Sequence, residues 1–240
     1  MTYPDSSYLI KQIDLKTPLI GFFDAPGIEE FEPLVRPQAG ACVYSFYQDW
    51  LKGSTLLLTK SQYGCGGCGH WLFGIQARSR DEFLSFLVDQ EGLKCSRELM
   101  AQWIESSSAY EAENPYLLLG PLKQENYAYV KSITFFINPD QLSTLSYGAQ
   151  YYSAPDDPPP VIAPFGSGCS QLFPFDNPDI PQAAIGATDL AMRQHVPPQI
   201  LAFTVTKSMF EQLCSLDEQS FLGKPFLQRV KEARSGKLDF

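Results

Sequence analysis

The stretch of sequence that decides the fold lies at residues 128–138, which read AYVKSITFFIN. It is rich in β-branched and aromatic side chains, a composition typical of a buried strand. Directly after it, Asn138 and Pro139 form the cap and the first position of a predicted helix. A strand that passes at once into a helix indicates an α/β architecture, and we expect this strand to lie in the middle of the sheet.

Shorter apolar segments on both sides of this strand alternate with segments of helical periodicity. Two of the helical segments predict an insertion near residues 79–105, whose first helix begins with a capping box of Ser79 and Glu82. We therefore predict an α/β fold, or a mixed α+β fold, in a single compact domain over residues 1–240. The expected strands are 17–24, 54–60, 182–188 and 200–206, and the expected helices are 41–51, 80–90, 97–104 and one that opens with a Ser208–Glu211 capping box.

The order of these segments is similar in two halves of the chain. In the first half an apolar strand leads to Cys42, an aromatic-rich segment, a second strand and a loop at Cys65. In the second half an apolar strand leads to Cys169, an aromatic-rich segment, a second strand and a loop at Gly186. This parallel predicts two similar α/β halves about a pseudo-two-fold axis, with these four positions near a common centre. The alternative is that any α/β chain shows such an alternation. The halves span about 17–105 and 128–216.

Composition excludes several classes of protein. The chain of 240 residues has 18 basic and 27 acidic side chains, a formal charge of −9 at pH 7. Without a Lys- or Arg-rich run, it has little to neutralise a nucleic-acid backbone or an anionic membrane. No segment has the roughly 18 consecutive apolar residues of a membrane span, and the first residues, MTYPD, do not read as a secretory signal. We expect a cytoplasmic protein without nucleic-acid or membrane partners, whose six cysteines are thiols.

The sharpest local feature is the C-x-x-C motif Cys65-Gly66-Gly67-Cys68, in a glycine-rich loop after a strand. Two thiols at this spacing can bind one metal or close a small disulfide ring, and the glycines allow the necessary tight turn. Structural zinc needs four protein ligands, and the sequence has no second pair of this kind. A thiolate-bound metal, such as an iron–sulfur cluster, would recruit Cys42 and Cys169. The other interpretations are a thiol–disulfide pair and a tight turn with partly buried, inert thiols.

The same loop also favours an anion-binding site. Its glycines, followed by the start of a helix, would present backbone N–H groups to a phosphate or carboxylate. The loop matches neither of the common nucleotide-binding glycine motifs. A second glycine loop and a nearby arginine would complete the site. The predicted ligand-binding residues are Gly64, Gly66, Gly67, His70 as the helix start, Gly186 and Arg193.

A cysteine nucleophile is the third chemistry that the residues allow. Cys169 would attack a substrate with His70 as its base, provided that the fold brings the two together. The sequence around Cys169 does not satisfy the G-x-S-x-G motif of serine hydrolases, and the chain has only two histidines.

The spacing of glycines and cysteines resembles that of the DUF169 family, bacterial and archaeal proteins with no agreed activity. In the first half the resemblance rests on Cys42, Gly53, Gly64-Cys65-Gly66-Gly67 and Gly74, and over the whole chain it spans about Leu19 to Leu213. The resemblance implies that the chain has the fold of this family and that Cys42, Cys65 and Cys169 lie near one another. In the second half it rests on Asn138-Pro139, Gly168-Cys169-Ser170, Ile185-Gly186 and Arg193.

Two positions depart from the family pattern. Ala187 stands where many relatives have a cysteine, and Cys68 adds a thiol that the family's loop does not require. The number of thiols available as ligands therefore does not follow from the resemblance.

These observations lead to three hypotheses and leave open whether the protein is an enzyme. The first is a cytoplasmic, thiol-dependent protein that uses the C-x-x-C loop to bind a metal or redox cofactor. The second is a non-catalytic protein that binds a small anionic molecule through the glycine loops. The third is a cysteine-nucleophile enzyme. The candidate metal or redox residues are Cys42, Cys65, Cys68 and Cys169.

Overall fold

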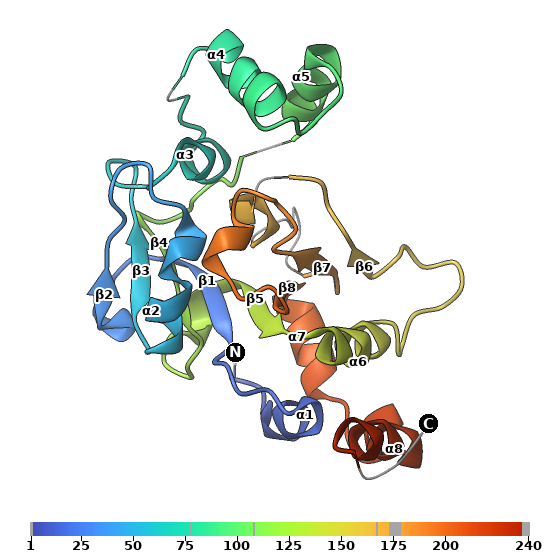
Figure 1. Ribbon diagram of the computed structural model, residues 1–240. Coiled ribbons are helices and arrows are strands. Elements are labelled where there is room, and N and C mark those ends of the chain that lie inside the picture. The colour runs from blue at the N-terminus through green and yellow to red at the C-terminus, as the bar shows by residue number, and fades with distance from the viewer. Residues whose placement is uncertain (1, 77, 108, 167, 173–178, 237–240) are drawn as a thin grey trace.

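A mixed eight-stranded sheet crosses the molecule in the computed structural model, which describes residues 2–76, 78–107, 109–166, 168–172 and 179–236 (Figure 1). The predicted 128–138 strand is one of its two central strands, and the predicted α/β class is confirmed. The strands are β1 (Ile20–Ala25), β2 (Leu34–Val35), β3 (Thr55–Leu58), β4 (Tyr116–Pro121), β5 (Val130–Ile137), β6 (Val161–Ile162), β7 (Ala183–Gly186) and β8 (Leu201–Thr206).

Neighbouring strands follow the order β2-β3-β4-β1-β5-β8-β7-β6. β1 and β5 pair antiparallel in the middle, and each edge ends in a two-residue strand that is parallel to its neighbour, β2 to β3 and β6 to β7. From its own edge inward, the first half has the order β2-β3-β4-β1. The second half, from the opposite edge inward, has the matching order β6-β7-β8-β5. This order agrees with two similar halves, whereas the pseudo-two-fold axis itself stays a prediction.

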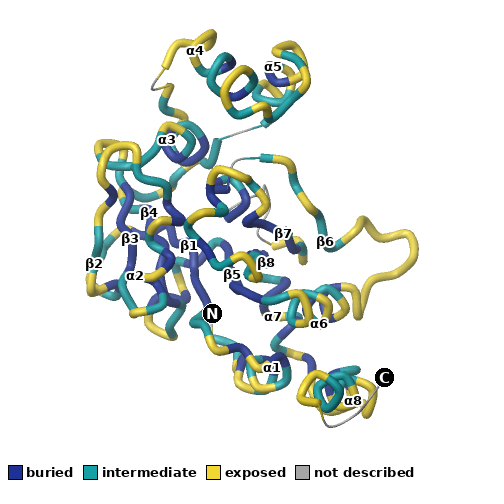
Figure 2. Tube along the Cα trace, viewed as in Figure 1, coloured by how far each residue is buried: buried dark blue, intermediate teal, exposed yellow. Residues whose placement is uncertain are grey.

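Both faces of the sheet are buried, because alternate side chains of its strands enter two different cores. In β5, Ile133 and Phe135 belong to one core, and Phe136 belongs to the other. The first core is covered by α1 (Ser7–Ile13), α6 (Pro139–Ala149) and α7 (Lys207–Cys214), and the second by α2 (Tyr47–Leu51) and α3 (Gly66–Phe73). Figure 2 shows the strands as the dark-blue interior between these layers. The remaining α-helices are α4 (Arg80–Ser85), α5 (Arg97–Ser106) and α8 (Pro225–Arg234).

Several short helical segments complete the cores and connections. Two of them, η2 and η5, lie in the second core with α2 and α3. The 3-10 segments are η1 (Glu29–Phe31), η2 (Val43–Phe46), η4 (Tyr127–Tyr129), η5 (Gly168–Gln171), η6 (Arg193–His195) and η7 (Phe221–Gly223), and η3 (Phe86–Gln90) is a π-helical turn.

The helix starts test the capping predictions. Asn138 and Gln141 form a capping box at the start of α6, where Pro139 is the first residue, and Ser79 and Glu82 form one at α4. The box predicted for α7 is wrong. Because β8 runs directly into the helix, the side chain of Thr206 accepts the Met209 N–H at 3.2 Å and caps α7 two residues earlier than Ser208 would.

The predicted insertion consists of α4, η3 and α5 and has a small core of its own. Leu84, Leu87 and Met100 are buried in this core. The ring of Trp103 joins the insertion to the rest of the protein, with its centroid 5.0 Å from that of Trp71 in α3 and 4.9 Å from that of Phe165. Figure 1 shows the insertion standing beyond α3 at one end of the molecule.

A buried carboxylate anchors the chain where it returns from the insertion to β4. Asp24 of β1 is only 1% exposed. Its oxygens accept hydrogen bonds from the Tyr110 hydroxyl at 3.0 Å and from the backbone N–H groups of Glu113 and Asn114 at 2.7 and 2.9 Å. The Tyr110 N–H in turn donates to the carbonyl oxygen of Trp71. Asp24 therefore fixes the segment that connects α3, the insertion and β4.

β4 was not predicted from the sequence, although it lies between β3 and β1 and is buried over most of its length. The short edge strands β2 and β6 were not predicted either. As for membranes, the helices in the described ranges include none with the length and apolar character of a membrane span.

Candidate functional site

Four thiols from three segments meet on the face of the sheet covered by α2 and α3, and we call Cys42, Cys65, Cys68 and Cys169 the thiol cluster. The Cys65 and Cys68 sulfurs are 3.5 Å apart. The Cys169 thiol hydrogen-bonds with both of them, and Cys42 is close enough to interact electrostatically with Cys65. The cluster joins η2, α3 and η5, which come from different halves of the chain.

The local sequence explains how Cys65 reaches this position. Gly64 has φ = 82°, a left-handed conformation that favours glycine. A Cβ atom at Gly64 would lie 2.5 Å from the carbonyl oxygen of Ala41, so the missing side chain lets the loop pack beside Cys42. Cys65 then becomes the N-cap of α3, which starts at Gly66. The helix start predicted at His70 is wrong, because the glycines themselves form the first turn.

This geometry predicts a difference between two neighbouring glycines. Gly64→Ala should lower the free energy of unfolding by roughly 2 kcal/mol or more, because it adds left-handed strain and a clash with Ala41. Gly66→Ala is the matched control. Its Cβ would meet nothing within 4 Å, so it should leave the stability within about 1 kcal/mol of the parent. Urea unfolding measures both, and equal effects would contradict the assigned role of Gly64.

The thiols of the cluster differ in acidity. The pKa of Cys65 lies well below that of an ordinary thiol, because its thiolate is held by hydrogen bonds from the Cys169 and Cys68 thiols and from the backbone N–H groups of Cys68 and Gly67. The same thiol contacts, with burial, raise the pKa of Cys68. Burial raises the pKa of Cys42 to about 11. Cys65 is therefore the thiol of the cluster that ionises most readily.

The surroundings of the cluster are acidic. Burial first, then the charges of Asp189 and Cys65, raise the pKa of Glu91, which lies just after the π-helical turn of the insertion. Asp189 also raises the pKa of Cys42. A site with these neighbours favours a neutral or cationic ligand over an anionic one.

Two hydrogen-bonded pairs hold the segment that carries Cys169. Asp189 accepts the Gly168 N–H at 2.8 Å. The amide of Gln171, which is 1% exposed, donates to the Thr188 hydroxyl at 2.8 Å and accepts the Thr188 N–H at 3.3 Å. Cys169 itself is 5% exposed. The loop after β7 thus positions Cys169 against α3.

Two of the predicted anion-binding residues, Gly186 and Arg193, lie outside the loop that leads into α3. Gly186, at the end of β7, packs against Gln171. A Cβ atom added to Gly186 would lie 3.1 Å from the Cβ atom of Gln171. The Arg193 guanidinium donates to four backbone carbonyls, those of Ala187, Ile200, Pro197 and Pro198. Arg193 therefore fixes loop conformation, and its role toward an anion stays a prediction.

The ring of His70 packs between aromatic side chains. Its centroid is 4.4 Å from that of Trp71 and 5.4 Å from that of Phe83. Burial lowers the pKa of His70, so the imidazole is neutral at pH 7. Its predicted role as the base for Cys169 stays a prediction.

The described residues contain no group of three or more Cys, His, Asp and Glu side chains arranged to hold a metal ion. The predicted iron–sulfur cluster or other thiolate-bound metal therefore receives no support from this geometry. The sulfur contacts support chemistry between the thiols themselves.

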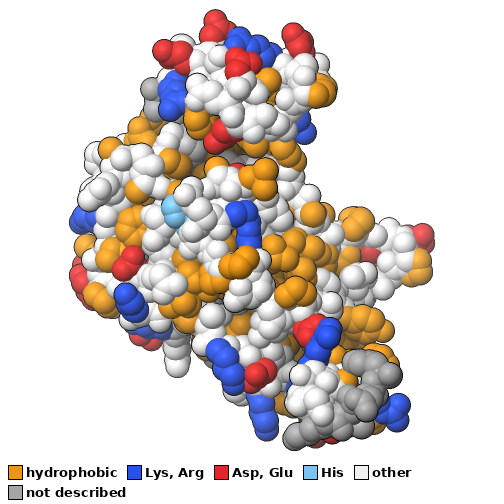
Figure 3. Space-filling view, in the orientation of Figure 1, with side chains coloured by type: hydrophobic (Ala, Val, Ile, Leu, Met, Phe, Trp, Pro, Cys, Tyr) orange, Lys and Arg blue, Asp and Glu red, His pale blue; other side chains and the backbone are white. Residues whose placement is uncertain are grey.

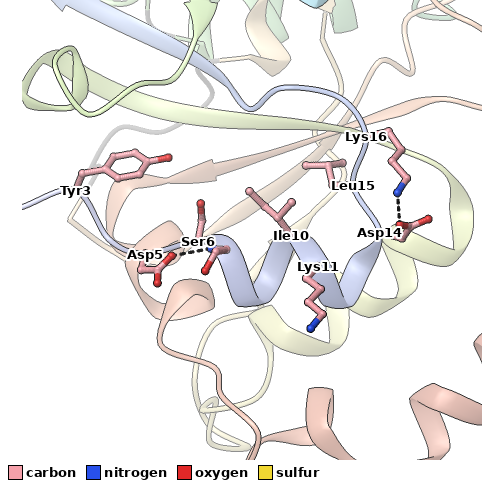
Figure 4. A pocket seen from close by; sticks show the side chains of 9 residues that line it. Tyr3, Asp5, Ser6, Ile10, Lys11, Asp14, Leu15 and Lys16 are labelled. Atoms are coloured by element: carbon pink, nitrogen blue, oxygen red, sulfur yellow. Dashed lines mark hydrogen bonds and ion pairs between the residues drawn. The ribbon is translucent and has the colours of Figure 1, made fainter.

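A surface hollow of about 570 Å3 along α1 is the other candidate (Figure 4). Two pairs of its polar groups bind each other: Lys16 with Asp14 at 2.5 Å, and Asp5 with the Ser7 N–H at 2.9 Å. No Cys or His is among the described residues that line it. On the face in Figure 3, Lys and Arg side chains are interspersed with Asp and Glu. The thiol cluster is therefore the better candidate for a functional site.

Sequence reasoning did not assign roles at the cluster to Tyr44, Gln171 or Glu91. Tyr44 and Gln171 are buried beside Cys169, and Glu91 of the insertion interacts electrostatically with Cys65. No local pattern marks these residues, because their neighbours are distant along the chain. The position of Asp189 directly after the second glycine loop was the sequence feature that pointed to this residue.

Comparison with known proteins identifies the family of the chain. The sequence matches DUF169, described as an uncharacterised ArCR family, over residues 8–215 of the 240-residue chain. No curated protein and no solved structure matches it. The matched range runs from α1 to the end of α7 and includes the whole thiol cluster. The chain therefore belongs to the DUF169 family, as the spacing of its glycines and cysteines suggested.

Proposed function

We propose that the protein carries out thiol–disulfide exchange, with Cys65 as the nucleophile and Cys68 as the resolving thiol. The observation that carries the proposal is the placement of Cys65 at the N-cap of α3 with its sulfur 3.5 Å from that of Cys68. A helix N-terminus stabilises a thiolate through backbone N–H groups and the helix dipole. The buried second thiol lies one turn further along α3, within reach of the first.

The exchange takes place in two steps with an oxidised partner that contains a disulfide. The Cys65 thiolate attacks one partner sulfur, which forms a mixed disulfide and expels the other partner sulfur as a thiolate. Cys68 then loses its proton and attacks the Cys65 sulfur, which closes the Cys65–Cys68 disulfide and expels the remaining partner thiolate. The protein dithiol has been oxidised by two electrons, and the partner disulfide has been reduced.

Two features support this proposal over an anion-binding protein. The carboxyl groups of Asp189 and Glu91 lie close to the cluster, and Arg193 already donates to backbone carbonyls. We further propose that the protein works in the cytoplasm, where the thiol pool would return the disulfide to the dithiol form.

A redox titration tests the proposal. The full chain with Cys95→Ser, which removes an exposed thiol outside the cluster, is equilibrated in glutathione and dithiothreitol buffers from about −150 to −320 mV. Free thiols are then counted by alkylation and mass spectrometry. We expect a reversible loss of two thiols that disappears when Cys65 and Cys68 are both replaced by serine and persists in Cys214→Ser, on α7. A thiol count that stays constant over the whole range would rule out the proposed function.

A further inference from the structure

The cluster places a third sulfur against the proposed dithiol. Cys169 hydrogen-bonds with both Cys65 and Cys68, and η5 packs against α3. Cys68 and Cys169 are 0% and 5% exposed, whereas Cys65 is partly exposed. One thiol therefore faces the partner, and the other two face each other in the interior.

We infer that the disulfide first formed between Cys65 and Cys68 passes to Cys68 and Cys169, so that the oxidised protein stores its disulfide in the core and regains Cys65. The inference rests on the proposed function and adds a second exchange to it. The Cys169 thiol loses its proton and its sulfur attacks the Cys68 sulfur. A Cys68–Cys169 bond forms, the Cys65–Cys68 bond breaks, and the electron pair leaves on Cys65 as a thiolate. One proton is released, and no oxidant is consumed.

The leaving group determines the direction of this exchange. A thiol–disulfide exchange is faster when the expelled sulfur is the weaker base. Attack on Cys68 expels Cys65, whose thiolate is held by the helix N-terminus and by neighbouring thiols. Attack on Cys65 would instead expel Cys68, which is fully buried and a poorer leaving group. The first route is therefore favoured.

The protein positions Cys169 for this attack. Asp189 holds the neighbouring Gly168 by its N–H, and Gln171 is fixed through Thr188. At Gly168 a Cβ would lie 3.0 Å from Cε2 of Tyr44, so the tyrosine ring lies directly against this segment.

The Tyr44 hydroxyl is a buried donor near the sulfur that must ionise. It is 0% exposed, and its oxygen has no partner with hydrogen-bond geometry among the described residues, although the Ala187 N–H approaches it. Among the ionisable groups, Cys169 has the strongest electrostatic interaction with the Tyr44 hydroxyl, followed by Cys42 and Asp189. A buried donor of this kind stabilises a thiolate when one forms beside it.

Disulfide mapping distinguishes the two oxidised forms. Trypsin releases Cys65 and Cys68 together in peptide 61–78, and Cys169 alone in peptide 132–193. The Cys95→Ser protein is oxidised with glutathione disulfide, quenched with acid at successive times, alkylated and digested. We expect peptide 61–78 with an internal disulfide at early times. At late times the two peptides should be joined, with an alkylated Cys65.

The variants and outcomes separate the two claims. In Cys65→Ser the joined peptides should form at least roughly tenfold more slowly, because the partly exposed low-pKa thiol is missing. Cys214→Ser should behave like the parent. A persistent Cys65–Cys68 disulfide with an alkylated Cys169 would overturn the transfer and leave the proposed function intact. Equally fast joining in Cys65→Ser would also overturn it. The absence of any disulfide in the cluster would overturn both.

Discussion

Replacing Cys65 with serine is expected to lower the rate of alkylation by iodoacetamide at pH 6 by roughly tenfold to a hundredfold. At this pH an ordinary thiol is almost entirely protonated and unreactive. Cys65 has a lowered pKa, so its thiolate persists as the pH falls. The parent rate should therefore be nearly constant from about pH 5 to 8. In the variant it should rise only toward alkaline pH, since burial raises the pKa of Cys42 to about 11.

The measurement uses a Cys95→Ser background, because the exposed Cys95 would react as well. Cys214→Ser is the matched control: burial, the largest cause, raises the pKa of Cys214 to about 12, so its removal should not change the rate at pH 6. If the parent protein reacts at pH 6 no faster than free cysteine, Cys65 is not a stabilised thiolate.

Asp24→Ala should lower the free energy of unfolding by roughly 3 to 5 kcal/mol, the largest loss of stability that we predict for one side chain. The substitution leaves three donors without an acceptor, namely the Tyr110 hydroxyl and the N–H groups of Glu113 and Asn114. Each buried donor without a partner costs about 1 to 3 kcal/mol. Urea unfolding followed by tryptophan fluorescence measures the change.

Asp140→Ala is the control for this prediction. Asp140 pairs with Arg234 at 2.8 Å, but their side chains are 50% and 65% exposed, so the loss should stay below about 1 kcal/mol. A similar loss in the two variants would show that burial does not decide the contribution of Asp24.

The sheet was predictable where residue types and boundaries agree. The 128–138 segment combines β-branched and aromatic residues with a helix cap, and the structure places β5 and α6 there. The same holds for β8, where the observed strand Leu201–Thr206 nearly coincides with the predicted one at 200–206. In these segments local preference and tertiary position agree.

β4 was missed because its sequence lacks one of these signals, although Pro115 and Gly120-Pro121 bound it. Its residues YLLLGP contain no β-branched side chain, and burial on both faces removes the alternation of apolar and polar positions. The strand is instead stabilised by its neighbours β1 and β3, which are both distant along the chain. The first turn of α3 was not predicted for a similar reason. Glycine has a low helix propensity, and the loop before this turn is held by a hydrogen bond from the Gly40 N–H to the Gly64 carbonyl oxygen.

The sequence pointed to the cluster residues, but their chemistry depends on contacts that no local pattern encodes. The spacing of glycines and cysteines led to Cys42, Cys65, Cys68 and Cys169, and the structure brings them together. The difference between a thiolate at Cys65 and a neutral thiol at Cys68 arises from which groups donate hydrogen bonds to each sulfur. These donors come from separate segments, so only the folded chain specifies them.

The insertion also has a thermodynamic consequence. Its buried side chains Leu84, Leu87 and Met100 form a small separate core, and the rings of Trp103 and Phe83 contact Trp71 and His70 of α3. Cooperative units with few buried contacts open at a lower free energy than the central strands. The insertion can therefore unfold as a unit while the sheet stays intact, and amide hydrogens of α4 and α5 would exchange through this partial opening. Such an opening would expose Trp71 and the α3 helix that carries the reactive thiol.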